Sequence, residues 1–260
     1  MIDLGFSMAQ LEAFLLIFIR MTGLFILSPI FGRNNLPAVF KIGFSFFLAV
    51  IFVNVNEIPT VSMSSNITLY ALYIIKELVV GLVIGYATYV IMSAIYLAGQ
   101  MIDMQVGFGS VNVLDATSNI QVPLTSNFYY MYIILIFITL NGHFFIIQAL
   151  FKSFELIPIE SLGFNTNFTP ELIDIMQQMF EIALRIAAPI IATIFVADVV
   201  LGVLSRTIPQ MNVFQLGMPL KVIVGLAVIM VTFVYANGLT ETITELMNEY
   251  MLRFLMRMNS

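Results

Sequence analysis

The sequence predicts an all-α membrane protein built from long, broken apolar helices. Of its 260 residues, 60% are hydrophobic and only 10% are charged, whereas a soluble domain carries about 25% charged residues. So few charged side chains cannot cover a globular surface of this size, and lipid or other apolar subunits must surround much of the exterior. The net charge is −5, so no basic patch is expected for a phosphate backbone, and nucleic-acid binding is not expected.

Apolar stretches define the expected helices. They cover residues 11–31, 42–53, 69–98, 128–151, 172–204 and 213–236. A membrane-spanning helix needs about 20 predominantly apolar residues, so the second stretch is short for a span, while the third and fifth are long. The number of crossings and the orientation stay open, because lysine and arginine are divided almost evenly between the two sides. The first stretch is expected to be retained, since no basic region precedes it.

Charged residues interrupt several of these stretches. Charges at membrane depth are costly unless they face protein or water, which predicts that they are buried in protein or used in assembly. The residues inside the stretches are Arg20, Lys76, Glu77, Arg185 and Asp198, and the same role is expected of Arg206, which follows the fifth stretch.

The fifth stretch holds two features that need separate interpretation. Pro189 is expected to kink or break the helix there, because proline removes a helix hydrogen bond. Asp198 could relay protons or hold an ion, but Arg185 is too far along the helix to pair with it. The favoured interpretation is that Asp198 pairs with a lysine or arginine on a neighbouring helix.

Two further patterns concern helix packing. Gly81 and Gly85 form a G-x-x-x-G pair, a spacing that lets two helix backbones approach closely. In the tail, residues 238–260, glutamates recur every four residues among apolar ones. This periodicity predicts an amphipathic helix with one polar, solvent-exposed face.

The connection at 99–127 has an unusual composition. It contains no lysine, arginine, glutamate or histidine and only two aspartates. Loops longer than about 12–15 residues are usually functional or disordered, and the aliphatic content argues against disorder. A segment of this kind, given backbone freedom by Gly107 and Gly109, could close a pore by excluding water. The alternative, which composition alone favours, is a re-entrant packing loop that moves nothing.

No catalytic or cofactor site is predicted, and the protein is not expected to be an enzyme. His143 is the only histidine, and a pairing with Ser110 lacks the G-x-S-x-G elbow of a serine hydrolase. The sequence contains no H-E-x-x-H zinc motif and no glycine-rich phosphate loop followed by lysine. It also has no cysteine, which excludes thiolate metal sites.

Several segments in order resemble one protein family. They are RMTGLF at 20–25 with SPIFG at 28–32, Pro37 with KIG at 41–43, GQMIDMQVGFG at 99–109, NGH at 141–143, and AD at 197–198 with LSRTIPQMNVF at 204–214, followed by Gly217 and PLK at 219–221. With these segments the chain resembles, over essentially its whole length, the FliR-type flagellar biosynthesis proteins of the type III secretion export gate, which have virulence-secretion counterparts.

The resemblance implies a fold and partners. It implies helical hairpins within a closed helical hetero-oligomeric assembly with FliP-like and FliQ-like subunits and an FlhB-like subunit beside them. The assembly is a pore for unfolded export substrates, in the bacterial cell membrane at the flagellar basal body. Residues 1–171 would be the FliP-like part. Residues 172–260 would be a FliQ-like helical hairpin with an amphipathic tail.

The resemblance also implies a pore plug at residues 107–122. The expected plug residues are Phe108, Val111, Val113 and Leu114, with Gly107 and Gly109 as hinges. The implied function is a subunit that forms and closes the pore of the flagellar type III protein export gate.

A secondary transporter of a small solute or ion is the alternative function. Asp198, Arg185 and Lys76 would then lie in its pathway. Inverted or parallel repeats are expected of such transporters, and the sequence contains none that are convincing.

Overall fold

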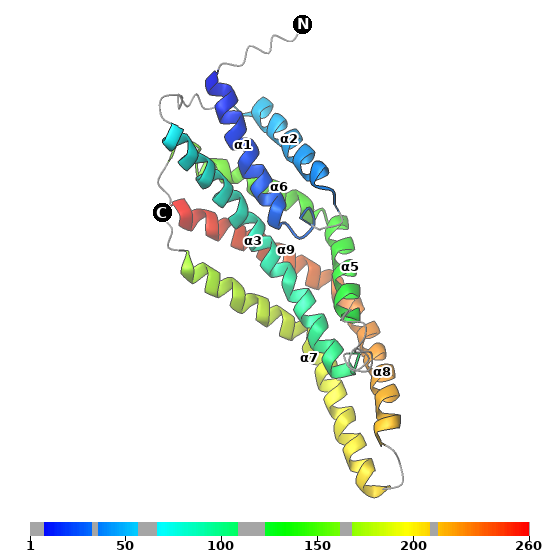
Figure 1. Ribbon diagram of the computed structural model, residues 1–260. Coiled ribbons are helices and arrows are strands. Elements are labelled where there is room, and N and C mark those ends of the chain that lie inside the picture. Colours follow the sequence, from blue (N-terminus) through cyan, green and yellow to red (C-terminus); the bar gives the residue numbers. More distant parts are fainter. Residues whose placement is uncertain are drawn as a thin grey trace. The chain divides into compact units, whose positions relative to one another are not determined.

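A computed structural model describes residues 8–32, 36–56, 67–108, 123–161, 168–208 and 213–259 (Figure 1). Within these ranges the regular structure is helical and no strand is present. The helices are α1 (Met8–Leu27), α2 (Ala38–Val55), α3 (Ile67–Val106), α5 (Leu124–Thr139), α6 (Gly142–Leu156), α7 (Thr169–Thr207), α8 (Val213–Thr232), the short 3-10 helix η1 (Phe233–Tyr235) and α9 (Ala236–Asn259).

The predicted all-α membrane class is confirmed. In the described part of the chain five helices are long and apolar enough to cross a membrane, or up to six if the broken pair α5 and α6 is one span. α3 has 40 residues and α7 has 39. At about 1.5 Å per residue each is roughly 60 Å long, twice the hydrocarbon core of about 30 Å. Each helix therefore exceeds the length of a single perpendicular span, as the long apolar stretches indicated.

The chain divides into two compact units. The first comprises Met1–Val90, Asn141–Ile175 and Thr244–Ser260, and the second comprises Ile91–Leu140 and Met176–Ile243. The predicted division into a FliP-like 1–171 and a FliQ-like 172–260 concerns likeness to separate subunits and stays a prediction.

In the first unit, α1 lies between α2 and the start of α3 (Figure 1). Phe14 of α1 meets Phe46 of α2 edge to face, with ring centroids 5.5 Å apart. On its other side α1 approaches α3 at glycines: a β-carbon at Gly81 would overlap the Arg20 carbonyl oxygen, and one at Gly23 would lie 2.8 Å from the Leu78 carbonyl oxygen. The predicted G-x-x-x-G pair thus serves a close approach within this chain.

In the second unit, α7 and α8 lie side by side (Figure 1). Here α7 runs through Pro189 without a break, so of the predicted kink or break only the break is wrong. Ile186 and Ile190, close to the proline in the helix, are buried, and packing of this kind can keep a helix continuous although proline removes one hydrogen bond. Figure 1 shows α7 changing direction in mid-helix.

The predicted connection at 99–127 is shorter in the structure. α3 continues to Val106 and α5 begins at Leu124, so assigning 99–106 to a loop was wrong. These residues carry a single charged side chain, Asp103, and form a packed helix end, with Ile102 and Val106 buried. The helix ends at Gly107, whose φ of +99° is in the region that favours glycine.

The amphipathic tail is confirmed as α9. Its three glutamates, Glu241, Glu245 and Glu249, are exposed. Met247 and Phe254 on the helix are buried. The polar, solvent-exposed face of α9 is therefore where the four-residue spacing predicts it.

Candidate functional site

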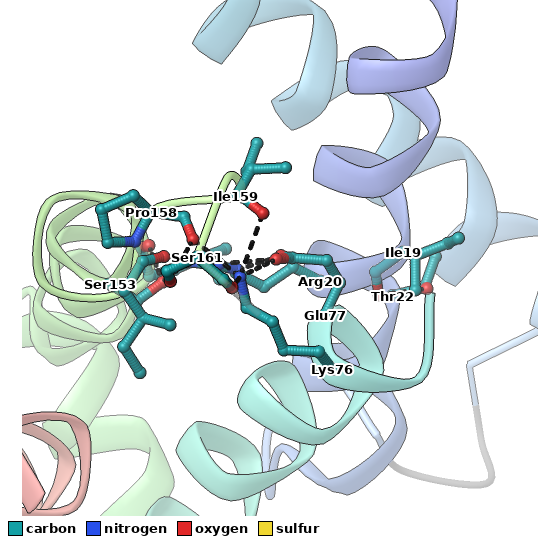
Figure 2. Close-up of polar contacts among 11 residues, drawn as sticks. Ile19, Arg20, Thr22, Lys76, Glu77, Ser153, Pro158, Ile159 and Ser161 are labelled. Atoms are coloured by element: carbon teal, nitrogen blue, oxygen red, sulfur yellow. Dashed lines mark hydrogen bonds and ion pairs between the residues drawn. The ribbon is translucent and has the colours of Figure 1, made fainter. Parts of the chain in front are cut away.

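A buried ion network lies within the first unit (Figure 2). Arg20 of α1 donates to both carboxylate oxygens of Glu77 on α3, at 2.5 and 3.0 Å. Both side chains have an exposed fraction of 0%. The paired geometry is the strong two-point form of an arginine–carboxylate interaction, and the close approach of the two helices at glycine brings its partners within reach.

Arg20 also reaches a third element, α6 and the turn that follows it. Its guanidinium donates to Ser153 Oγ at 3.1 Å and to the Ile157 carbonyl at 2.8 Å. The same group lies 4.0 Å from the centre of the Phe154 ring. One side chain therefore connects α1, α3 and α6.

Lys76 completes the network with an excess positive charge. Its ammonium is 3.1 Å from Glu77 Oε1, and it donates to three backbone carbonyls after α6, those of Pro158, Ile159 and Ser161, at 2.7, 3.2 and 2.7 Å. Carbonyl oxygens thus solvate the second cation, which the one carboxylate cannot fully neutralise. The prediction that Arg20, Lys76 and Glu77 are buried is confirmed, while any role in subunit assembly stays a prediction.

The charged residues of α7 are less buried. Asp198 pairs with Lys221 of α8, the two side chains being 35% and 27% exposed. The interpretation of Asp198 as a carboxylate paired with a base on a neighbouring helix is therefore confirmed. Arg185 is 73% exposed and pairs with Glu181 one turn away at 2.5 Å, and Arg206 is exposed near the end of α7. The structure does not bury Arg185 and Arg206 within the described chain.

The two helices that flank the neutral segment are joined in the second unit. The carboxylate of Asp103, near the end of α3, accepts the backbone N–H of Thr125 at 3.0 and 3.2 Å. Ser126 Oγ donates to the Tyr96 carbonyl at 2.9 Å, and a β-carbon at Gly99 would lie 2.5 Å from the Ser126 backbone nitrogen. The sequence analysis missed this junction, although an aspartate in an otherwise apolar helix end, ahead of a helix that starts after a proline, was a possible signal for it.

The predicted plug lies mostly outside the described residues. Gly107 and Phe108 are described and follow the end of α3, whereas Gly109, Val111, Val113 and Leu114 fall in 109–122, outside the described ranges. The same holds for Ser110, so its pairing with His143 is untested. Among the described residues no group of three or more histidine, cysteine or acidic residues could hold a metal ion.

Large apolar side chains are exposed on several helices. On α2 they form a nearly continuous face, comprising Val39, Phe40, Ile42, Phe46, Phe47, Ile51 and Val55. On α5 they recur at helical spacing, at Leu124, Phe128, Met131, Leu135 and Ile138. Exposed apolar area on this scale marks a membrane or protein interaction surface.

Sequence comparisons identify similar proteins. The family described as "Bacterial export proteins, family 1" matches residues 11–248. The flagellar biosynthetic protein FliR of Bacillus subtilis (strain 168) is 37% identical over 84% of this chain and 85% of that protein. FliR of Escherichia coli (strain K12) is 26% identical over 80% and 79%. The secretion system apparatus protein SsaT of Salmonella typhimurium is 27% identical over 62% of each chain.

Proposed function

This chain belongs to the bacterial export proteins, family 1, and from that premise we propose that it is a subunit of the flagellar type III protein export gate. In this role it forms and closes the pore through which unfolded flagellar subunits cross the cell membrane at the flagellar basal body. The observation that carries the proposal is the similarity to FliR of Bacillus subtilis across most of both chains.

The described helices support an assembly role. The apolar faces of α2 and α5 are exposed in the single chain. The charged groups of Arg20, Glu77 and Lys76, in contrast, find their partners within the chain. A rigid core with apolar outer faces suits a subunit that is packed among other membrane proteins. The proposed neighbours are FliP-like, FliQ-like and FlhB-like subunits.

The neutral segment at 107–122 is the proposed plug. Phe108, Val111, Val113 and Leu114 would exclude water from the pore, with Gly107 and Gly109 as hinges. The glycine at 107 has a positive φ directly after α3, which supports a change of chain direction there.

Two experiments test the proposal at separate levels. Deletion of the gene should abolish swimming motility, and expression of the intact chain should restore it; a deletion strain that swims normally would reject the flagellar role.

Deletion of residues 108–114, or replacement of Val111 and Val113 by glycine, should raise ion leakage through the assembled gate. Unchanged conductance in membranes that hold the full complex would reject pore closure by this segment.

Co-purification distinguishes a gate subunit from the transporter alternative. A gate subunit should co-purify with other small membrane proteins, which a transporter does not require. Lys76 donates to three carbonyls and neighbours Glu77, and Asp198 is paired with Lys221. Among the residues that the structure describes, no contact favours Asp198, Arg185 and Lys76 as a solute pathway.

A further inference from the structure

A pocket in the first unit lies where α2 and α6 end. Its volume is about 320 Å³, at the lower end of the range for ligand pockets. Phe52, Phe154 and Ile159 form a buried, apolar floor. Phe52 of α2 packs on two phenylalanines of α6, with ring centroids 4.3 Å from Phe154 and 5.4 Å from Phe151. The floor is therefore a set of aromatic rings that two helices hold in place.

The rim of the pocket is acidic. Glu155 of α6 and Glu160 in the turn after it line the rim, and both residues are exposed. Among the residues that the structure describes, neither glutamate forms an ion pair, and no lysine or arginine lines the pocket. Lys152, three residues before Glu155, makes no ion pair with it either. The described chain therefore supplies no counter-ion for these two carboxylates.

Both helix ends add negative potential to the pocket. Asn56, the C-cap of α2, and Glu155, in the last turn of α6, line it. The last carbonyls of a helix have no partner inside that helix, and the helix dipole favours a cation nearby. The carbonyls after α6 already bind two buried cations, since they accept from Arg20 and Lys76. The surroundings of the pocket therefore favour a positive charge.

The charges beneath the pocket and on its rim do not balance. The buried network contributes two bases, Arg20 and Lys76, and one acid, Glu77, and the rim adds two acids. These five side chains carry two positive and three negative charges, which leaves one negative charge in excess. One cationic side chain in the pocket would make the group neutral. The same excess disfavours the phosphate of a lipid head group.

Arginine fits this pocket better than lysine does. Its guanidinium is planar, stacks on aromatic rings and can donate to two carboxylates at once. The protein uses this combination inside the same unit, where the Arg20 guanidinium lies 4.0 Å from the centre of the Phe154 ring and pairs with Glu77. The pocket offers a second cation the same two kinds of partner, aromatic rings and carboxylates.

A neighbouring subunit is placed to supply that cation. The exposed apolar face of α2 ends beside the pocket, at Ile51 and Val55, so a subunit that covers this face also reaches the pocket. We propose that the pocket binds one arginine side chain of a neighbouring gate subunit, which packs on the aromatic floor and pairs with Glu155 and Glu160. This inference rests on the proposed function, which provides the neighbouring subunits.

The absence of cysteine from the chain allows a direct test. Asn56→Cys places the only thiol of this chain at the rim and keeps both glutamates. The complete gate is purified and treated with two reagents that carry a maleimide for the thiol and differ in their second group. One carries a phenylglyoxal, which reacts with arginine, and the other carries an activated ester, which reacts with lysine. Mass spectrometry then identifies the residue that is joined to position 56.

The phenylglyoxal reagent should join position 56 to an arginine of another subunit. Glu155→Gln with Glu160→Gln, added to Asn56→Cys, should lower the joined fraction roughly tenfold, the effect of losing a charge-assisted hydrogen bond. The matched control is Glu241→Gln with Glu245→Gln, which neutralises two exposed glutamates of α9. This control should leave the joined fraction unchanged. Asn56→Cys alone decides the identity of the bound side chain even if the glutamine variant does not assemble.

Three results would overturn the inference: joining by the lysine reagent alone, joining to an arginine of this same chain, or an equal fall for the control. An assembled gate that gives no joined product would also overturn it, and the proposed function would then stand. If the chain co-purifies with no other membrane protein, the proposed function fails and the inference fails with it. Co-purification therefore distinguishes the two failures.

Discussion

Arg20 and Glu77 form a two-point ion pair that neither side chain shares with solvent, although they belong to different helices. Burying two charges costs more than a surface pair does, and the mutual attraction compensates only when geometry is good and the remaining donors are satisfied. Here Ser153 and the Ile157 carbonyl accept the remaining arginine bonds. The network therefore orders three helices and depends on all its members.

Loss of the carboxylate should be the most damaging change in this network. Glu77→Gln leaves Arg20 and Lys76 as buried cations without a counter-ion, and breaking a buried pair costs about 3–5 kcal/mol. We expect a large fall in the heat stability of the chain in the co-expressed gate. Glu160→Gln is the matched control, since Glu160 is exposed. Equal stability of the two variants would contradict the structural role of the network.

Gly81 should not tolerate a side chain. Gly81→Ala would place a β-carbon on the Arg20 carbonyl oxygen, forcing α1 and α3 apart and stretching the Arg20–Glu77 pair. The matched control is Gly43→Ala, because nothing lies within 4 Å of a β-carbon there, and alanine is favoured over glycine in a helix by about 0.5–1 kcal/mol. Protease resistance of the assembled complex should fall for the first variant and be kept or improved for the second.

The Asp198–Lys221 pair should matter less to stability than the buried network. Both side chains are partly exposed, and such pairs contribute about 0–1 kcal/mol. Asp198→Lys, which opposes two cations, should weaken the contact of α7 with α8, and adding Lys221→Asp should restore it. Thermal unfolding of the four combinations gives the coupling energy. Absence of any recovery in the exchanged pair would show that the two charges do not interact.

The exposed apolar faces predict dependence on partner subunits. When expressed alone, the chain should aggregate or be degraded, because the faces of α2 and α5 have no cover. Co-expression with FliP-like and FliQ-like subunits should raise its yield in detergent. Phe47→Ser on the exposed face of α2 should reduce that gain, whereas Asn54→Ser, which changes an exposed polar side chain of the same helix, should not. A well-behaved monomer would contradict the prediction.

The sequence predicted much of the fold because composition and periodicity are local signals. The apolar stretches predicted the helices, and the glutamate spacing predicted α9. The burial of Arg20, Lys76 and Glu77 followed from the cost of charge at membrane depth. Residues 99–106 were misassigned because a low content of charged residues is typical of a buried helix end as well as of an unusual loop.

The contacts between residues far apart in the sequence could not be predicted in the same way. The bond from Asp103 to Thr125 joins residues 22 positions apart, and the carbonyls around Lys76 are more than 80 positions away in sequence. Every residue carries a backbone carbonyl oxygen, whatever its side chain, so the sequence does not reveal which carbonyls accept a hydrogen bond. Continuation of α7 through Pro189 depends on packing around the proline, which a local propensity does not contain.

Lys76 and Glu77 are adjacent in sequence, so the register of α3 sets where both opposite charges point. One residue corresponds to about 100° of rotation around a helix, and an insertion between 67 and 76 would leave this pair in place while turning every preceding side chain. An insertion between Glu77 and Gly81 would do the reverse and separate the charges from the glycine crossing. Residues can therefore be added to α3 before Lys76 or after Gly85 without displacing the charges from the glycine crossing, whereas an insertion between Glu77 and Gly81 would displace them.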